Sequence, residues 1–193
     1  VPFVWSTLLI CLSGTSAGSA AILGFAFGIF QFGFGLSWIA ESFYVEADRF
    51  GALAIPSVAG LSAFLAIFPT FASVVFARST RYANPGVPAA LILACAWTGG
   101  EWLRGHLLTG FPWNLAGYAV ADFDRLRQPA AWVGSYGMSF LVVFIGALPG
   151  AAWVAKGRHR HSTIVAALLL PLATWTAGSI RLIQTKSTPT GVF

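Results

Sequence analysis

Long apolar runs, separated by short turn-rich loops, constrain the fold of this chain more than any other feature of its sequence. A helix that crosses the hydrocarbon core of a bilayer needs about 20 apolar residues, with a range of roughly 17 to 25. One apolar run near the N-terminus, Phe3–Leu12, is too short to span alone and is interpreted as part of a longer span. The sequence therefore predicts an all-α, multi-pass transmembrane bundle with one partial N-terminal span and five full spans: Ser19–Tyr44, Ala52–Ala77, Val87–Leu108, Ala131–Ala155 and Thr163–Ile180.

The shortage of charged side chains supports the same fold class. Only 9% of the 193 residues are charged, 57% are hydrophobic, and the mean hydropathy is +0.77. A soluble domain carries roughly 25% charged residues, so this chain has too few to cover a water-facing surface. The net charge of +5 is therefore not the footprint of a nucleic-acid-binding protein. The basic residues lie instead in short loops, where such residues orient membrane spans.

Lysine and arginine in the short loops predict the orientation of the spans. The loops at 78–86 and 156–161 are the most basic, and they lie on the same side of the membrane if the spans alternate. Positive loops favour the cytoplasm. The loops at 45–51 and 109–130 mix arginines with acidic residues and fall outside. The tail after the last span then emerges in the periplasm, although Arg181 and Lys186 weaken this bias.

The glycines of the first full span indicate close helix packing, and the aromatic residues at its end indicate a membrane interface. Gly24 and Gly28 form a small-xxx-small pair, which allows two helices to approach closely. Trp38, Phe43 and Tyr44 lie near the end of this span, as residues of an interfacial aromatic belt do.

Three other patterns are better explained by structure than by chemistry. Cys11 and Cys95 lie in apolar runs without a basic neighbour, and we expect both to be buried rather than nucleophilic. His159 and His161 alternate with arginines that would repel a metal ion, so we expect a basic loop near anionic headgroups. Residues 14–18, GTSAG, fit G-x-S-x-G but lack the strand and helix of a nucleophile elbow. No metal or cofactor is expected.

The stretch EWLRGHLLTGFPWNLAGYA, residues 101–119, brings charge into an otherwise apolar span. Glu101 and Arg104 are three residues apart and therefore share one face of a helix. One interpretation is an ion pair that braces the outer end of the span, with Trp102 as an interfacial anchor. The other is that charge within the membrane marks a function. The residues alone leave both interpretations open.

A turn follows these charges at Gly110-Phe111-Pro112-Trp113. Gly110 allows a sharp bend, and Pro112 ends any helix. Aromatic residues at this position offer apolar surface to the membrane interface. We therefore expect the loop to lie on or in the surface of the outer leaflet. The candidate lipid-facing site consists of Glu101, Arg104, Phe111, Pro112 and Trp113.

Residues 101–119 resemble the signature of the membrane domain of bacterial apolipoprotein N-acyltransferases. Two further stretches agree with that family in order and spacing: GFAFGIFQFGFGLSWIAESFYVEADRFG (24–51) and WVGSYGMSFLVVFIGAL (132–148). The resemblance covers residues 20–181. It implies an enzyme of the bacterial inner membrane that transfers an acyl chain from a phospholipid to the N-terminal diacylglyceryl-cysteine of a lipoprotein. The family works by ping-pong chemistry on the periplasmic side, with a multi-pass domain joined to a nitrilase-like αββα domain.

The family's Glu–Lys–Cys triad, whose thiolate becomes acylated, belongs to the nitrilase-like domain. No position of this chain matches it, because both cysteines lie in predicted spans and Lys156 lies in a predicted cytoplasmic loop. We therefore expect no catalytic residue here. The resemblance implies a membrane domain over residues 1–181 and a truncated linker over 182–193, in a fragment that is inactive alone.

Two other classes of protein compete with this interpretation. The alternative is a degenerate, non-enzymatic membrane protein that binds lipid or a partner. A transporter is less favoured, because the sequence shows no inverted repeat and no pair of broken helices of the kind those folds use.

Overall fold

The computed structural model describes residues 2–81 and 84–185, and all regular elements within these ranges are helices. The predicted all-α class is confirmed. Lys186 and most of the predicted tail over 182–193 lie outside the described residues. The elements are α1 (Pro2–Leu12), α2 (Ala17–Gly35), α3 (Ile39–Tyr44), α4 (Ala47–Phe50), the 3-10 turn η1 (Gly51–Leu53), α5 (Ala54–Leu65), α6 (Ile67–Ser79), α7 (Val87–His106), the 3-10 turn η2 (Ala116–Val120), α8 (Asp124–Arg127), α9 (Ala130–Val154) and α10 (Gly157–Gln184).

Four helical stretches are long and apolar enough to cross a membrane, which supports a multi-pass membrane protein. They are α2, the run Ala47–Ser79, α9 and α10. The predicted number of five is not confirmed, because the expected span Val87–Leu108 forms α7, whose second half carries Glu101, Arg104 and His106. Helix α7 packs between α6 and α9. A helix enclosed by neighbours can carry polar side chains that a lipid-facing helix cannot.

Two predicted spans are not single helices. The first ends at Gly35 and turns before α3 begins, so the expected helix Ser19–Tyr44 is broken. Glycines at 33 and 35 weaken the helix at this point. The second changes from α5 to α6 at Ala66. Proline lacks the N–H that would bond four residues back, so Pro69 leaves the carbonyl of Leu65 without its helical donor.

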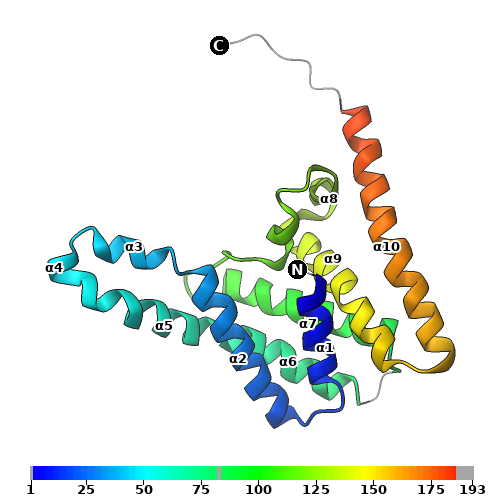
Figure 1. Cartoon of the computed structure of the whole chain (residues 1–193), viewed down its shortest axis with the longest axis horizontal. Helices are drawn as coiled ribbons and strands as arrows, with labels where there is room; N and C mark the ends of the chain where they lie inside the picture. The colour runs from blue at the N-terminus through cyan, green and yellow to red at the C-terminus, as the bar shows by residue number, and fades with distance from the viewer. Residues whose placement is uncertain (1, 82–83, 186–193) are drawn as a thin grey trace.

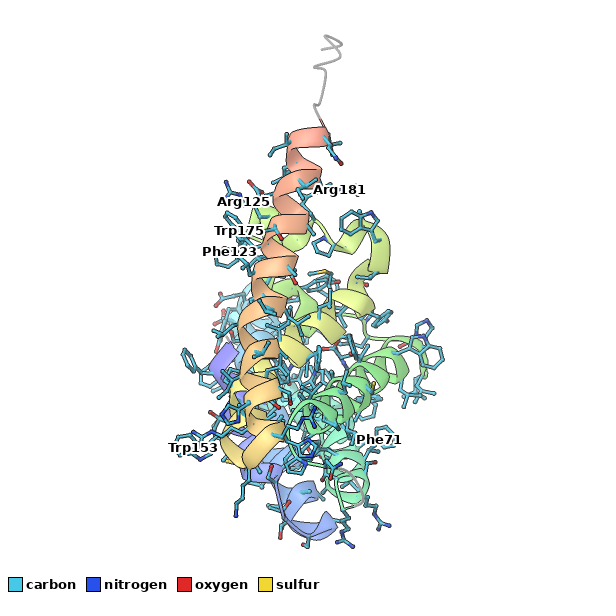
Figure 2. All side chains as sticks on the ribbon, turned by 90° about the vertical axis from the view of Figure 1, so that its right-hand side faces the viewer. Phe71, Phe123, Arg125, Trp153, Trp175 and Arg181 are labelled. Atoms are coloured by element: carbon cyan, nitrogen blue, oxygen red, sulfur yellow. The ribbon has the colours of Figure 1, made fainter. Side chains whose placement is uncertain are left out.

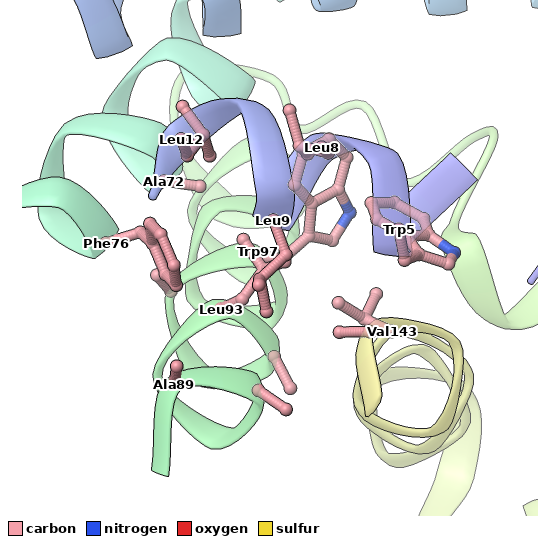
Figure 3. Packing of buried hydrophobic residues seen from close by; sticks show 14 of the residues in the cluster. Trp5, Leu8, Leu9, Leu12, Ala72, Phe76, Ala89, Leu93, Trp97 and Val143 are labelled. Carbon is pink, nitrogen blue, oxygen red and sulfur yellow. The ribbon is translucent and has the colours of Figure 1, made fainter. Parts of the chain in front are cut away.

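The centre of the molecule is formed by α1, α2, α6, α7 and α9, as Figure 1 shows. Helix α10 stands on one flank and contacts α9 and α8, while α3, α4 and α5 project on the other. The core joins leucines of α1 to Phe76 of α6, Leu93 of α7 and Val143 of α9 (Figure 3). Trp5 and Trp97 meet edge to face with ring centroids 4.5 Å apart, an arrangement that aromatic quadrupoles favour.

Glycine pairs allow two of these helix contacts. A Cβ at Gly28 would lie 2.7 Å from Ala66 Cα, and one at Gly24 would lie 2.8 Å from the carbonyl oxygen of Pro69. The predicted packing role of the Gly24/Gly28 pair is confirmed. A second pair, which the sequence analysis missed, is Gly146 and Gly150 on α9 against α1.

Ser6 of α1 reinforces this second contact. Its hydroxyl donates to the carbonyl of Gly146 at 2.7 Å and accepts from the N–H of Gly150 at 3.0 Å. A Cβ at Gly150 would meet backbone atoms of Ser6, including Cα at 2.8 Å. Backbone atoms cannot rotate away as a side chain can, so α1 and α9 require glycine here.

The two basic loops lie at the same end of the bundle. The N–H of Val87 donates to the hydroxyl of Thr163 at 3.1 Å, which joins the start of α7 to the first turns of α10. The prediction that the loops at 78–86 and 156–161 share one side is confirmed for their described parts. The loop after α7, and the end of α10, therefore lie toward the opposite side.

The expected burial of the cysteines is wrong. Cys11 and Cys95 are both exposed on the outside of the bundle. In a membrane protein the outward surface meets lipid, which is as apolar as a protein core. An apolar run therefore does not distinguish an inward position from an outward one.

Candidate functional site

Helix α7 carries the two charges of residues 101–119 on its covered face. Glu101 is 4% exposed and Arg104 is 2% exposed, although both lie in the last two turns of the helix. Their separation by three residues places both side chains on one face, as predicted. Charges this well covered need polar partners, because an unpaired buried charge is costly.

The two side chains do not form the ion pair that the sequence analysis considered. Within the described residues, 2–81 and 84–185, there is one salt bridge, which joins Arg127 to Asp124 at 2.7 Å on the surface. Glu101 and Arg104 instead bind different parts of the segment that follows α7. We call this segment, residues 107–123, the site loop.

Glu101 holds the second half of the site loop. Its Oε1 atom accepts from the indole N–H of Trp97 at 3.0 Å and from the backbone N–H of Ala116 at 2.8 Å. The next amide, that of Gly117, donates to the hydroxyl of Ser139 on α9 at 3.0 Å. Two consecutive amides are therefore fixed by side chains of α7 and α9.

Arg104 holds the first half of the site loop. Its Nη1 atom donates to the carbonyl of Phe111 at 2.9 Å and to that of Trp113. The backbone carbonyl of Arg104 also accepts from the N–H of Phe111 at 2.8 Å. The guanidinium lies 5.0 Å from the ring centroid of Phe32, a favourable position for a cation near an aromatic face. The turn after Gly110 is thus bound to α7 by three hydrogen bonds.

The turn itself points its residues in two directions. Gly110 has φ of 75°, a left-handed conformation that glycine adopts without strain. Phe111 packs inward against the cluster of Phe32, Leu36 and Leu65. Pro112 is exposed. Trp113 is 56% exposed, and its ring lies 5.9 Å from that of Trp38, which is 53% exposed.

A small cavity adjoins the two charged side chains on the side of α2 and α6. Its volume is about 10 Å³, and Gln31, Glu101 and Arg104 contribute to its wall. Within the described part of the chain, Gln31 Oε1, Glu101 Oε2 and Arg104 Nη2 have no hydrogen-bond partner. A space of this size accommodates about one water molecule and is far too small for an acyl chain. The exposed surface of the site is therefore the outer side of the turn, at Pro112 and Trp113.

The arrangement positions a loop and offers no nucleophile at the turn. Cys11 and Cys95 lie on the outer surface, and Lys156 lies in the connection between α9 and α10, at the opposite end. Ser16 of the G-x-S-x-G stretch is the N-cap of α2 and accepts from the N–H of Ser19 at 3.1 Å. Trp97 and Ser139 were not predicted as part of the site. The spacing of Trp97 four residues before Glu101 indicates a shared face, whereas nothing local indicates Ser139.

Comparison with known proteins identifies what these elements belong to. A family model described as the apolipoprotein N-acyltransferase N-terminal domain matches residues 1–148 of the chain, which is more than half of it and includes α7 and the site loop. The chain belongs to the apolipoprotein N-acyltransferase family. The resemblance seen in the three sequence stretches is therefore confirmed.

Individual members of the family agree with this assignment. The chain is 38% identical to the apolipoprotein N-acyltransferase of Brucella suis over 179 residues, covering 90% of the chain and 32% of that protein. It is 38% identical to that of Rhodopseudomonas palustris over 187 residues, with 93% and 34% covered. For Rhizobium meliloti the identity is 40% over 170 residues, with 88% and 31% covered. The chain spans about a third of the length of these curated relatives.

Proposed function

We propose that this chain is the membrane domain of an apolipoprotein N-acyltransferase, and that the whole enzyme moves an acyl chain from a phospholipid to the N-terminal diacylglyceryl-cysteine of a lipoprotein. The match of the family N-terminal domain to residues 1–148 carries this proposal. The long apolar helices support an inner-membrane location. The chain alone is proposed to be inactive, because covalent acyl transfer needs an activated nucleophile and neither cysteine has a basic neighbour in sequence.

A chimera tests this proposed function directly. Residues 1–185 replace the matching segment of the Brucella suis relative, and the chimera is assayed for acylation of a diacylglyceryl lipopeptide by labelled phospholipid. We expect the chimera to acylate the lipopeptide, and the 193-residue chain alone to form no acyl-enzyme. A chimera that elutes as a folded monodisperse protein and is inactive, or a stable thioester on Cys11 or Cys95 of the chain alone, would contradict the proposal.

Within such an enzyme, we propose that the site loop guides acyl chains from the outer leaflet toward the catalytic domain. Glu101 and Arg104 hold the loop through backbone groups, so the exposed Trp113 is kept at a fixed place beside Trp38. A preorganised apolar surface at the interface lowers the cost of ordering a lipid chain there.

Replacing Trp113 with alanine should separate this role from folding. The indole is half exposed and lies outside the core, so the yield of folded chimera should stay nearly unchanged. Acylation by phospholipid should slow by about tenfold, equivalent to about 1.4 kcal/mol in the barrier. Trp153→Ala is the matched control, because Trp153 is 74% exposed and lies at the C-terminal end of α9, away from the site loop. Loss of folded protein with an unchanged acylation rate would make the turn a structural anchor only.

The orientation of the chain is a separate proposal. The basic loops at 78–86 and 156–161 share one end of the bundle, and positive loops favour the cytoplasm. A periplasm-active reporter fused after Phe193 should therefore be active, and the same reporter fused after His159 should be silent. The reverse pattern would place the site loop in the cytoplasm and exclude a periplasmic role.

A further inference from the structure

An apolar groove separates α9 from α10 on the flank of the bundle, and Val120 near the end of the site loop lines part of it. Its volume is about 290 Å³, and η2 and α8 line one end of it through Val120 and Leu126. Its single polar lining side chain is Thr174, whose hydroxyl already donates to the carbonyl of Leu170 at 2.8 Å. The other walls include Leu126, Met138, Leu141 and Pro171. The groove therefore suits a hydrocarbon and offers nothing to a polar ligand.

The dimensions of the groove match one acyl chain. Its α9 wall runs from Met138 to Gly146, and the eight residue steps between them correspond to about 12 Å at the helical rise of 1.5 Å per residue. One leaflet contributes about 15 Å of hydrocarbon, half of the roughly 30 Å core. A chain lying in this groove would run along most of one leaflet.

Two arginines lie at the end of the groove that α8 lines. The guanidinium of Arg125 lies 4.4 Å from the ring centroid of Trp175, the residue after Thr174 on α10. Arg181 donates from Nε to Gln128 Oε1 at 3.2 Å and lies 5.3 Å from the ring centroid of Trp132. Within the described ranges, neither arginine has a carboxylate within 4.0 Å. Figure 2 shows Arg125, Trp175 and Arg181 together near one end of α10.

The position of these arginines along α10 corresponds to a headgroup layer. Arg160 and Arg181 are 21 residues apart on this helix, or about 32 Å, close to the roughly 30 Å of a hydrocarbon core. Trp132 and Phe123, which are 61% and 59% exposed, lie at the same end as Arg181 and form part of an aromatic belt. Arg181 is therefore placed where lipid phosphates lie, and Arg125 lies beside Trp175, six residues or about 9 Å closer to the hydrocarbon core along α10.

The backbone of α8 is fixed against α10 by a close contact. Gly178 is buried, and a Cβ at this position would run into the carbonyl of Arg125. Because Gly178 has no side chain, the backbone of Arg125 packs directly against α10. This contact fixes the position of Arg125 relative to Arg181, which lies on the same helix as Gly178. The cationic end of the groove is part of the packed fold and does not depend on a free loop.

We propose that α8, α9 and α10 hold one anionic glycerophospholipid as a resident lipid. Its phosphate lies between Arg125 and Arg181, and one acyl chain fills the groove down to Gly146. Guanidinium groups bind phosphate oxygens through charge-assisted hydrogen bonds, and each arginine near an anionic headgroup adds about 1 kcal/mol, or roughly fivefold in affinity. This lipid is distinct from the acyl donor, so the proposal stands or falls independently of acyl transfer.

Native mass spectrometry of the 193-residue chain tests the headgroup contact. The chain is prepared in detergent that contains equimolar phosphatidylglycerol and phosphatidylethanolamine with identical acyl chains. It is then released from the detergent in the mass spectrometer with any lipid that it binds. We expect one bound phosphatidylglycerol in preference to phosphatidylethanolamine. In the R125Q/R181Q variant, the ratio of bound phosphatidylglycerol to bound phosphatidylethanolamine should fall roughly 25-fold, because each arginine contributes about fivefold. The R125K/R181K variant keeps the charges and should retain most of the preference.

The matched control for charge is R49Q, because Arg49 also lies over an aromatic ring, that of Phe50 at 5.1 Å, away from the groove. R49Q should leave the preference intact. Equal binding of the two lipids by the unmodified chain would overturn the proposal. An equal loss in R49Q and in R125Q/R181Q would overturn it as well, because any surface arginine would then suffice.

Filling the groove tests the contact with the acyl chain. Thr174→Phe places a ring in the groove and should lower retention of the bound lipid at least fivefold. Thr176→Phe, two residues further along α10 on an exposed face, should not. Unchanged lipid retention in Thr174→Phe, with both variants folded, would show that the groove is not occupied by an acyl chain. Displacement of the lipid by glycerol phosphate alone would equally contradict the proposal.

Discussion

Replacing Arg104 with methionine is expected to lower the free energy of unfolding by about 3–5 kcal/mol, the range measured when one partner of a buried charge arrangement is removed. Methionine keeps most of the side-chain volume but donates no hydrogen bond. The carbonyls of Phe111 and Trp113 would lose their donor. Glu101 would be left as a covered carboxylate without the cation one turn away. The site loop should then detach from α7.

Two conservative variants divide this loss into its causes. Arg104→Lys keeps the charge, but a single ammonium group cannot reproduce the planar fork that reaches two carbonyls. We expect it to lose about 1.5–3 kcal/mol, the value of one hydrogen bond to a charged group. Glu101→Gln keeps an oxygen that accepts from Trp97 and Ala116, so its loss reports mainly the charge. Because the two residues hold one loop, the double variant should cost less than the sum.

The measurement is unfolding by SDS in mixed micelles, followed by tryptophan fluorescence. Arg49→Met serves as the control, because this arginine is exposed and should change stability by less than about 0.5 kcal/mol. A loss below about 1 kcal/mol for Arg104→Met would place this residue in the range of surface pairs. In that case, Arg104 would not hold the site loop.

The fold class could be predicted because its determinants are local. Run length and hydropathy in one segment decide whether a helix can cross a membrane, and four such segments have both properties in the structure. Helix α7 shows the limit of this reasoning. Its neighbours α6 and α9 cover it, so its hydropathy does not reveal its place in the bundle. The turn at Leu36, inside a continuous apolar run, was missed for a similar reason.

The candidate site could be located from the sequence, but its contacts could not. Spacing on α7 predicted that Glu101 and Arg104 share a face. Their partners at Ala116, Phe111 and Trp113 depend on how the site loop folds back. A pair of charges three residues apart is equally compatible with a mutual ion pair and with two separate contacts to a loop. Only the position of the loop decides between them.

The contact between α1 and α9 is equally non-local, and it leads to the second large effect. Replacing Gly150 with leucine should prevent α1 from packing on α9. A Cβ there meets the backbone of Ser6, and α1 brings Trp5, Leu9 and the rest of its core face to this contact. Overpacking a core alone costs about 1–3 kcal/mol. Displacing α1 would further expose buried side chains worth about 1.5–3 kcal/mol each.

Gly60→Leu is the matched control for this substitution. Gly60 lies inside α5, and a Cβ there has no atom within 4 Å. Leucine favours helix over glycine by roughly 0.8 kcal/mol, so Gly60→Leu should be neutral or stabilising, whereas Gly150→Leu should lose at least about 3 kcal/mol. Near-ultraviolet circular dichroism supplies a second measurement, because the Trp5–Trp97 pair spans α1 and α7. If Gly150→Leu keeps both its unfolding midpoint and this signal, then α1 does not depend on the glycine contact, and its place in the core is set by Trp5 and the leucines alone.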